Sequence, residues 1–307
     1  MILPLDFIET VKRVFGERGR TWLPLLPEIA AQCREMWGLA RGTLCPTMSM
    51  NYIEFTSTAD GEPVALKIGV PHEELFTEME ALALYDGRGA VRLLAADRDR
   101  GALLLQRAIP GTMLWQIGDN AQQTETAASV MKALWRSVPE ESHLPHFSRW
   151  TERAFRLTRT EWDPQEQWPR DLLDRAEQIM DRVSRDHTGD VVLHGDLHHE
   201  NILWDEASGW LVIDPKGVIG PRCLEVGRYI QNQLPGDAPL SIREALVRER
   251  IEIFSDILAI PRRDVVAGAL VDCVLGHVWY FEEEGPLGED WYQGIELSRL
   301  LSRILDE

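Results

Sequence analysis

The densest group of residues that could do chemistry runs from His194 to Asn201, in the order His-Gly-Asp-Leu-His-His-Glu-Asn. Two short apolar stretches, 202–204 and 210–213, follow it, and Asp214 comes directly after the second. If these stretches pair as a hairpin about Ala207-Ser208, Asn201 and Asp214 lie opposite each other at its open end. An amide oxygen and a carboxylate suit Mg²⁺, a hard cation that also binds substrate phosphates.

Asp196 lies five residues before Asn201 on the same expected loop, so it can face a substrate and accept a hydroxyl proton. We expect His194 to brace the loop by hydrogen bonds rather than to carry a proton. His198, His199 and Glu200 also invite a zinc interpretation. Adjacent side chains on a short loop point apart, however, and no distant cluster completes a zinc site, so we disfavour it.

The His-x-Asp loop, the downstream Asn and the later Asp resemble the catalytic core of the kinase-like phosphotransferases. Gly195 gives the His-Gly-Asp form of the aminoglycoside phosphotransferases, and Asp214-Pro215-Lys216-Gly217 stands where protein kinases have Asp-Phe-Gly. The strings HGDLHHENIL and GWLVIDPKGVIGP look closest to the streptomycin 6-phosphotransferase and hydroxyurea kinase branch. The resemblance extends over roughly residues 20 to 235.

This resemblance implies an α+β, bilobal, protein-kinase-like fold. Residues 1–108 would form a small, sheet-rich nucleotide-binding lobe with a leading helical segment, and residues 109–307 a larger, mainly helical lobe for catalysis and substrate binding. The implied enzyme uses ATP and Mg²⁺ to phosphorylate a hydroxyl of a small molecule, first of all an aminoglycoside of the streptomycin type. Asp196 would be the catalytic base, and Asn201 and Asp214 would hold the metal.

Lys67 stands in Val-Ala-Leu-Lys on an expected strand, which matches the kinase lysine that holds the α- and β-phosphates and pairs with a helix glutamate. The helix expected at 71–85 offers several glutamates. Glu78 lies within its apolar stripe, whereas Glu80 points about 200° away. A carboxylate inside an apolar stripe needs a partner, so we expect Glu78 to pair with Lys67.

The same resemblance makes Gln106 to Ala108 the hinge, whose backbone would bind adenine, and makes Leu105 the apolar lining behind it. The loop at 45–51 should cover the phosphates, yet it contains no glycine. Thr47 and Ser49 are small polar residues that could serve there.

Hydrophobic periodicity predicts the elements that position these residues. Expected helices span 5–39, with a break at 21–24, then 71–85, 121–137 and 170–186, and continue after 224; expected strands span 52–55, 64–68, 91–94, 102–106, 191–194, 202–204 and 210–213.

The chain of 307 residues has 32 Lys and Arg against 50 Asp and Glu, a net charge of −18. This charge disfavours nucleic acid and anionic membranes as partners and fits a cationic acceptor. Four scattered cysteines without a C-x-x-C pair argue against zinc or disulfides. Polar residues interrupt the apolar stretch at 265–281, which indicates a buried helix rather than a membrane span. The start has no signal-peptide pattern, and we expect a cytoplasmic protein, monomeric or weakly dimeric.

Two acidic groups could bind a cationic acceptor: Glu225, and the run Glu282, Glu283 and Glu284 that follows three aromatic residues. Guanidinium groups favour paired carboxylates and aromatic faces, although a run of charges more often forms a solvated surface. Lys216 has two open roles, contact with phosphate or an ion pair with Glu225 or another nearby acid. Three alternatives also stay open: a kinase of the same fold for hydroxyurea or a sugar, a nucleotide-binding pseudokinase without turnover, and a metal-dependent hydrolase. The sequence does not choose between ATP and GTP.

Overall fold

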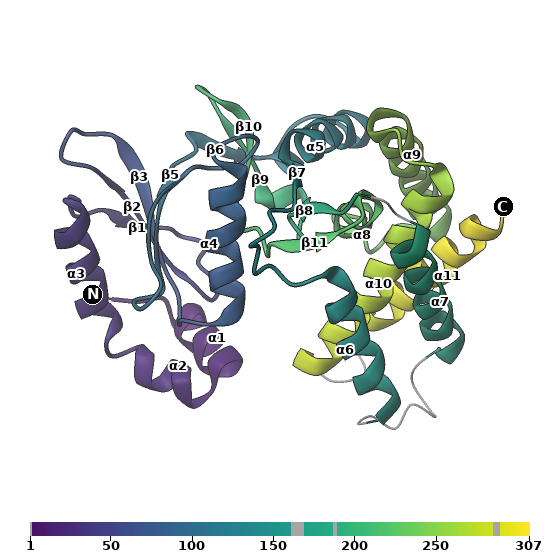
Figure 1. Cartoon of the computed structure of the whole chain (residues 1–307), viewed down its shortest axis with the longest axis horizontal. Coiled ribbons are helices and arrows are strands. Elements are labelled where there is room, and N and C mark those ends of the chain that lie inside the picture. Colours follow the sequence, from purple (N-terminus) through teal and green to yellow (C-terminus); the bar gives the residue numbers. More distant parts are fainter. Residues whose placement is uncertain (1, 161–168, 187–188, 285–288) are drawn as a thin grey trace.

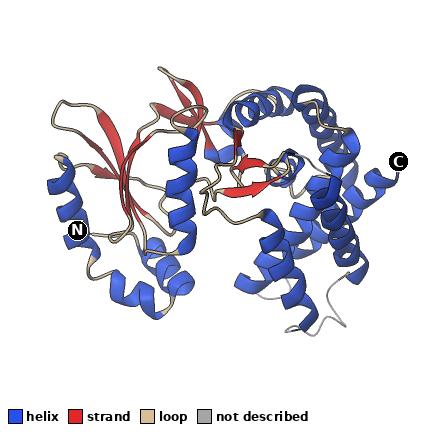
Figure 2. Ribbon diagram, in the orientation of Figure 1, coloured by secondary structure: helices blue, strands red, loops and turns tan. Residues whose placement is uncertain are grey.

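The chain folds into two lobes in the computed structural model, which describes residues 2–160, 169–186, 189–284 and 289–307 (Figure 1). The first lobe contains a sheet between helices, and the second is mainly helical (Figure 2). The chain passes from one to the other between the strands β5, which ends at Gln106, and β6, which begins at Pro110.

The first lobe is built on a five-stranded antiparallel sheet in the order β1-β2-β3-β5-β4. Its elements are α1 (Leu5–Phe15), α2 (Glu17–Trp22), α3 (Leu26–Trp37), β1 (Thr43–Leu44), β2 (Tyr52–Ser57), β3 (Pro63–Ile68), α4 (Glu73–Tyr85), β4 (Leu93–Asp97) and β5 (Ala102–Gln106). The leading helices α1 to α3 pack against one face of the sheet, in one core cluster with Leu66 and Ile68 of β3. Because strand side chains alternate, Ala65 and Lys67 point to the other face, where α4 lies.

The second lobe surrounds two small three-stranded sheets, in the orders β10-β9-β6 and β11-β8-β7. Its strands are β6 (Pro110–Met113), β7 (Arg136–Ser137), β8 (Val191–Leu193), β9 (Ile202–Asp205), β10 (Gly209–Val212) and β11 (Val218–Gly220). Its helices are η1 (Leu114–Gln116), α5 (Asn120–Leu134), α6 (Phe147–Thr160), α7 (Arg170–Asp186), η2 (His199–Asn201), η3 (Arg222–Leu224), α8 (Gly227–Gln231), α9 (Leu240–Leu258), α10 (Arg262–Glu284) and α11 (Glu289–Asp306).

Helix α10 is the central support of the second lobe. Its apolar residues from Val265 to Val278 are almost all fully buried, which confirms the interpretation of this stretch as a core helix. Among the described helices, none has both the length and the apolar character to cross a membrane. A Cβ atom on Gly268 would lie 1.9 Å from the carbonyl oxygen of Cys223, so this glycine lets η3 contact α10 directly.

Tertiary contacts explain the elements that periodicity missed. Helix α6 lies in a Trp- and charge-rich stretch, and its buried face is narrow. Strands β6, β7 and β11 have only two to four residues, and their existence depends on partners far away in the sequence. The leading helical pattern, with its break, is confirmed as α1, α2 and α3.

The predicted hairpin register is wrong by one residue. Val212 pairs with Ile202 and Gly209 with Asp205, so Asn201 lies opposite Ile213, whose N–H donates to the Asn201 carbonyl at 3.0 Å. The turn between the paired residues Asp205 and Gly209 has three residues, 206–208, instead of two. Gly209, the first residue of β10, takes φ of 80°, and the Asp205 carboxylate accepts the N–H of Ser208. Asp214 therefore lies one residue beyond the predicted pair, in a left-handed conformation with φ of 59°.

Replacing Gly268 by Ala tests the contact between α10 and η3. Helix propensity alone predicts a gain of about 1 kcal/mol in the free energy of unfolding. We expect a loss of about 1–3 kcal/mol instead, because the new methyl group collides with backbone. Chemical denaturation measures the difference. Gly276→Ala in the same helix is the control, because its Cβ meets Arg228 Nη1 at an ordinary 3.6 Å; equal effects of the two changes would contradict the prediction.

Candidate active site

A buried lysine joins the two lobes. Lys67 of β3 is 2% exposed, and its Nζ lies 2.6 and 2.8 Å from the two carboxylate oxygens of Glu78 on α4. The predicted ion pair is therefore present. The same Nζ lies 3.0 Å from Oδ1 of Asp214, in the loop that follows β10 of the second lobe. Three side chains, 147 residues apart at the extremes, thus meet at one ammonium group.

This cluster carries more negative than positive charge, because one ammonium faces two carboxylates. Although burial opposes the charge, the two carboxylates raise the pKa of Lys67 above its ordinary value, so it stays protonated. Burial raises the pKa of Glu78 to about 7, even against the Lys67 charge. The site therefore has an unbalanced negative charge that a bound cation would offset.

His194 fixes the loop that follows β8, as its sequence context predicted. Its ring is fully buried, and burial lowers its pKa to about 4, so the imidazole is neutral. Its Nδ1 accepts the N–H of Asp196 at 3.2 Å, and the proton on Nε2 is donated to the carbonyl of Ile213 at 2.9 Å. The His194 ring thus links the main chain of Asp196 to that of Ile213, the residue directly before Asp214.

Glu225 does not lie where the sequence analysis placed it. It is 2% exposed, and its two carboxylate oxygens accept the N–H groups of His194 at 2.8 Å and Gly195 at 3.1 Å. It therefore supports the loop from behind and is not among the residues that line the cavity in front of Asp196, which is described below. The reason is backbone chemistry: the two consecutive N–H groups need an acceptor, and a buried carboxylate supplies both.

The two oxygen ligands suggested for a metal lie near the ends of one hairpin: Asn201 directly precedes β9, and Asp214 lies two residues after β10. The Asn201 amide nitrogen donates to the backbone carbonyl of Asp196 at 2.9 Å, which leaves the amide oxygen as the coordinating atom. The Asp214 side chain is 40% exposed, and its pKa is held below the ordinary value because Lys67 outweighs the effect of burial. An amide oxygen and an ionised, accessible carboxylate in a site with excess negative charge fit Mg²⁺.

The described residues contain no group of three or more His, Cys, Asp and Glu side chains arranged for a metal. The histidines of the loop have other partners: His198 Nδ1 lies 2.6 Å from Glu200, and His199 Nδ1 lies 2.8 Å from Asn232. Where the structure describes the cysteines, all four are free.

Lys216 pairs with Glu74, not with the suggested Glu225. Its Nζ lies 2.8 Å from Glu74 Oε1 at the start of α4. Its backbone carbonyl accepts the hydroxyl of Thr77 on the same helix at 2.5 Å, and its own N–H donates to His194 at 2.8 Å. The loop after Asp214 is therefore tied both to α4 and to the loop of Asp196.

The residues suggested for the nucleotide lie along the edge between the lobes. Leu105 is buried on β5, opposite Ala65 of β3. Gln106 donates from its side chain to Ser208 in the β9–β10 turn at 3.3 Å. Within the described part of the chain, the backbone N–H and carbonyl of Ala108 have no hydrogen-bond partner. Ser49 lies exposed in the loop between β1 and β2.

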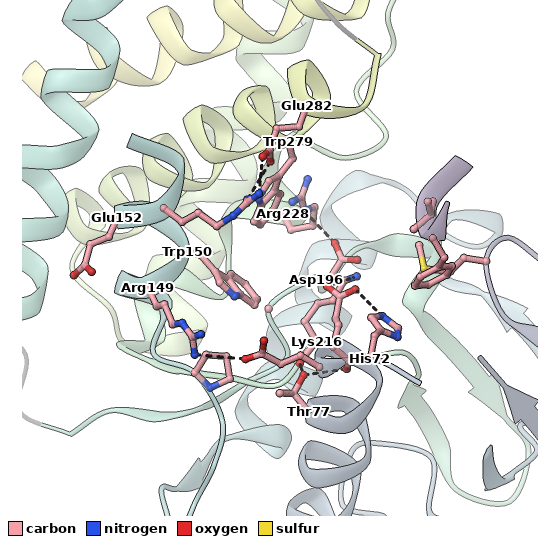
Figure 3. A pocket seen from close by; sticks show the side chains of 18 of the residues that line it. His72, Thr77, Arg149, Trp150, Glu152, Asp196, Lys216, Arg228, Trp279 and Glu282 are labelled. Carbon is pink, nitrogen blue, oxygen red and sulfur yellow. Dashed lines mark hydrogen bonds and ion pairs between the residues drawn. The ribbon is translucent and has the colours of Figure 1, made fainter. Parts of the chain in front are cut away.

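A cavity of about 880 Å³ opens in front of Asp196 (Figure 3). Trp150 of α6 and Trp279 of α10 line one side, with ring centroids 5.8 Å apart. Val14 and Phe15, at the end of α1, line the other side, and the Phe15 ring lies 5.0 Å from that of His72. Of the predicted acceptor ligands, Glu282 lines the cavity, whereas the side chains of Glu283 and Glu284 lie outside the described part.

The cavity is not acidic, in contrast to the chain as a whole. Five carboxylates and five Arg or Lys side chains line it, and four of the carboxylates already have a cationic partner. These pairs are Glu73–Arg149 at 3.4 Å, Glu74–Lys216 at 2.8 Å, Asp196–Arg228 at 3.1 Å and Glu282–Arg153 at 2.7 Å. Of these four cations, the sequence pointed only to Lys216. It did not indicate the three arginines as cavity residues, because arginines at helical spacing usually lie on a solvated surface.

The comparisons with known proteins agree with this arrangement. The profile of the family described as aminoglycoside/hydroxyurea antibiotic resistance kinase matches residues 37–285. Streptomycin 6-kinase of Streptomyces griseus is 27% identical over 290 residues, which cover 92% of this chain and 91% of the relative. Hydroxyurea phosphotransferase of Kitasatospora aureofaciens is 30% identical over 291 residues, covering 92% and 81%. Choline kinase LicA from Streptococcus pneumoniae, 12% identical, has a TM-score of 0.63 and covers 91% of this chain and 99% of its own, which shows a kinase-like fold.

Lys67→Met tests the charge balance of the buried cluster. Without the ammonium, the buried carboxylate of Glu78 and the partly exposed carboxylate of Asp214 lose their counter-ion, so we expect the free energy of unfolding to fall by about 3–5 kcal/mol. The double variant Lys67→Met with Glu78→Gln should lose less, because one of the two negative charges is gone. Denaturant titrations without added metal measure both. Lys132→Met, at an exposed lysine, is the control and should cost less than about 0.5 kcal/mol; a Lys67→Met protein as stable as this control would refute the prediction.

Proposed function

The chain belongs to the aminoglycoside/hydroxyurea antibiotic resistance kinase family and is a small-molecule kinase, and from that premise we propose that it transfers the γ-phosphoryl group of ATP to a hydroxyl of a small acceptor, with Mg²⁺ as the metal. One observation carries the proposal: Asp196 lines a large cavity, and the His194 ring ties its main chain to the residue before Asp214, which meets Lys67. Acceptor and nucleotide phosphates would thus approach each other at a carboxylate.

Each chemical role in this reaction has a residue in suitable surroundings. Asp196 orients the acceptor hydroxyl and takes its proton as the new O–P bond forms. Lys67, kept protonated and fixed by Glu78, binds the α- and β-phosphates as a point charge. Mg²⁺ held by Asn201 and Asp214 would neutralise the charge that develops on the phosphates. Because loose phosphoryl-transfer transition states need little covalent assistance, positioning and electrostatics supply most of the rate.

The lobes divide this work. Residues 1–108 would bind the nucleotide, with Leu105 behind the adenine, the backbone between Gln106 and Ala108 along its edge, and Ser49 above the phosphates. The unpartnered backbone of Ala108 supports this assignment, since an adenine edge offers one donor and one acceptor. Residues 109–307 would supply the catalytic loop and most of the acceptor cavity.

An aminoglycoside of the streptomycin type is the first acceptor to test. The names of the relatives suggest it, and the cavity offers two indole faces for guanidinium groups. Hydroxyurea, or another small neutral acceptor, is the second. The specific observation in its favour is that Arg or Lys side chains already neutralise four of the five cavity carboxylates.

The deciding experiment measures ADP release with Mg-ATP and Mg-GTP over streptomycin, other aminoglycosides, hydroxyurea and simple sugars, together with the mass of each product. A phosphorylated product from any acceptor supports phosphotransfer and identifies the acceptor class. Nucleotide binding without a product from the entire panel would overturn the proposal and leave a pseudokinase.

Asp196→Asn should lower kcat by a factor of about 10²–10⁴, because the amide cannot accept the proton. The dissociation constant for Mg-ATP should be unchanged, since no described contact joins Asp196 to the nucleotide lysine. Steady-state rates and nucleotide titrations measure the two effects. Glu206→Gln, in the exposed β9–β10 turn, is the matched control and should behave as wild type. Wild-type turnover by Asp196→Asn would remove Asp196 from its role as base.

A further inference from the structure

An arginine lies directly against the proposed catalytic carboxylate. Arg228, on the short helix α8, places its Nε 3.1 Å from Oδ1 of Asp196, and both side chains line the acceptor cavity (Figure 3). The two side chains are only 22% and 26% exposed. The contact is electrostatic, because Arg228 Nε lies within ion-pair distance of the carboxylate but has no hydrogen-bond partner among the described residues. Since water is largely excluded, the attraction is stronger than that of a pair on an open surface.

Helix α10 holds this arginine from behind. Asp272, 3% exposed, lies 3.8 Å from Arg228 Nε and also accepts a hydrogen bond from the side chain of Gln231. The guanidinium carbon lies 5.4 Å from the centroid of the Trp279 ring, within the range of a cation–π interaction. Asp272 and Trp279, seven residues apart on α10, thus give Arg228 a counter-charge and an aromatic ring to pack against.

Glycines bring this arginine into position. A Cβ on Gly227 would lie 2.3 Å from the Cβ of Asp272, so the backbone of α8 rests directly on α10. A Cβ on Gly276 would make only an ordinary contact of 3.6 Å with Arg228 Nη1, so the guanidinium lies alongside α10 at this position. The arginine is therefore confined by backbone packing as well as by charge.

A purely structural role, which would tie α8 to α10 through Asp272, does not explain the distances. Arg228 lies closer to Asp196, at 3.1 Å, than to Asp272, at 3.8 Å. Asp196 is on a loop that His194 and Glu225 hold only by its backbone. Among the described side chains, Arg228 alone forms an ion pair with the Asp196 carboxylate.

We propose that Arg228 is a positioning residue for phosphoryl transfer: it holds the Asp196 carboxylate by one oxygen and turns the other toward the acceptor hydroxyl. This inference rests on the proposed function of Asp196 as the base. Arginine suits the task because its planar group binds a carboxylate through one edge while its face lies on an indole, which an ammonium group cannot do.

The test compares Arg228→Met, Arg228→Lys and Arg228→Ala with wild type, using the acceptor found in the panel. We expect Arg228→Met to lower kcat by a factor of about 10², the usual cost of misplacing a reacting group by about 1 Å, with KM for ATP unchanged. Arg228→Lys should recover only part of this loss. Millimolar guanidinium, far below denaturing concentrations, should restore part of the activity of Arg228→Ala, a response that a structural role does not produce.

Arg222→Met is the matched control, because Arg222 also lies over an indole, that of Trp135 at 5.0 Å, but is exposed and outside the cavity. It should keep wild-type kcat. Thermal melting of every variant accompanies the kinetics. If kcat and melting temperature fall together, with no rescue by guanidinium, Arg228 is a structural residue and the inference is wrong.

A crystal structure of Arg228→Met separates this inference from the proposed function. If wild type phosphorylates no acceptor, the proposed function fails, yet the side-chain conformation of Asp196 in the variant still reports on Arg228. A rotated or disordered Asp196 side chain on an intact loop supports positioning by Arg228. An Asp196 side chain that keeps its wild-type conformation would overturn it.

Discussion

The structure depends on one buried ammonium group shared by carboxylates from two lobes. Lys67 can be fully desolvated only because Glu78 and Asp214 face it, and Asp214 can meet it only when the lobes are closed on each other. This interaction fixes the separation of β3, α4 and the loop after β10 at once. The same three elements would have to surround the phosphates of a nucleotide, so this one contact sets the geometry that the proposed chemistry needs.

Near Lys67, several polar side chains in the interior bind the main chain and not a ligand. Glu225 accepts two consecutive N–H groups, and the neutral ring of His194 links two loops by their main chains. Thr77 likewise binds the carbonyl of Lys216. A loop held in this way by its main chain keeps its shape while leaving the orientation of each functional side chain to be set by other neighbours, as Arg228 does for Asp196.

The sequence predicted the parts whose signals are local. The Lys67–Glu78 pair followed from one glutamate inside an apolar stripe, and the core helix α10 from a long apolar stretch that polar residues interrupt. The hairpin register failed by one residue because a three-residue turn before Gly209 replaced the assumed two-residue turn. Glu225 was misplaced, and Arg228 was missed, because their partners are 30 or more residues away and neither side chain differs in type from those on a solvated surface. Such roles depend on packing between elements, which local patterns do not encode.

The leading helices have a consequence for how relatives of this protein are classified. Val14 and Phe15 form a wall of the acceptor cavity, yet they precede residue 37, where the match to the family profile begins. The part of the chain that the family profile matches therefore does not include these two residues of the wall. Two relatives with identical catalytic strings can differ in substrate range, and a name transferred on those strings alone carries no information about that wall.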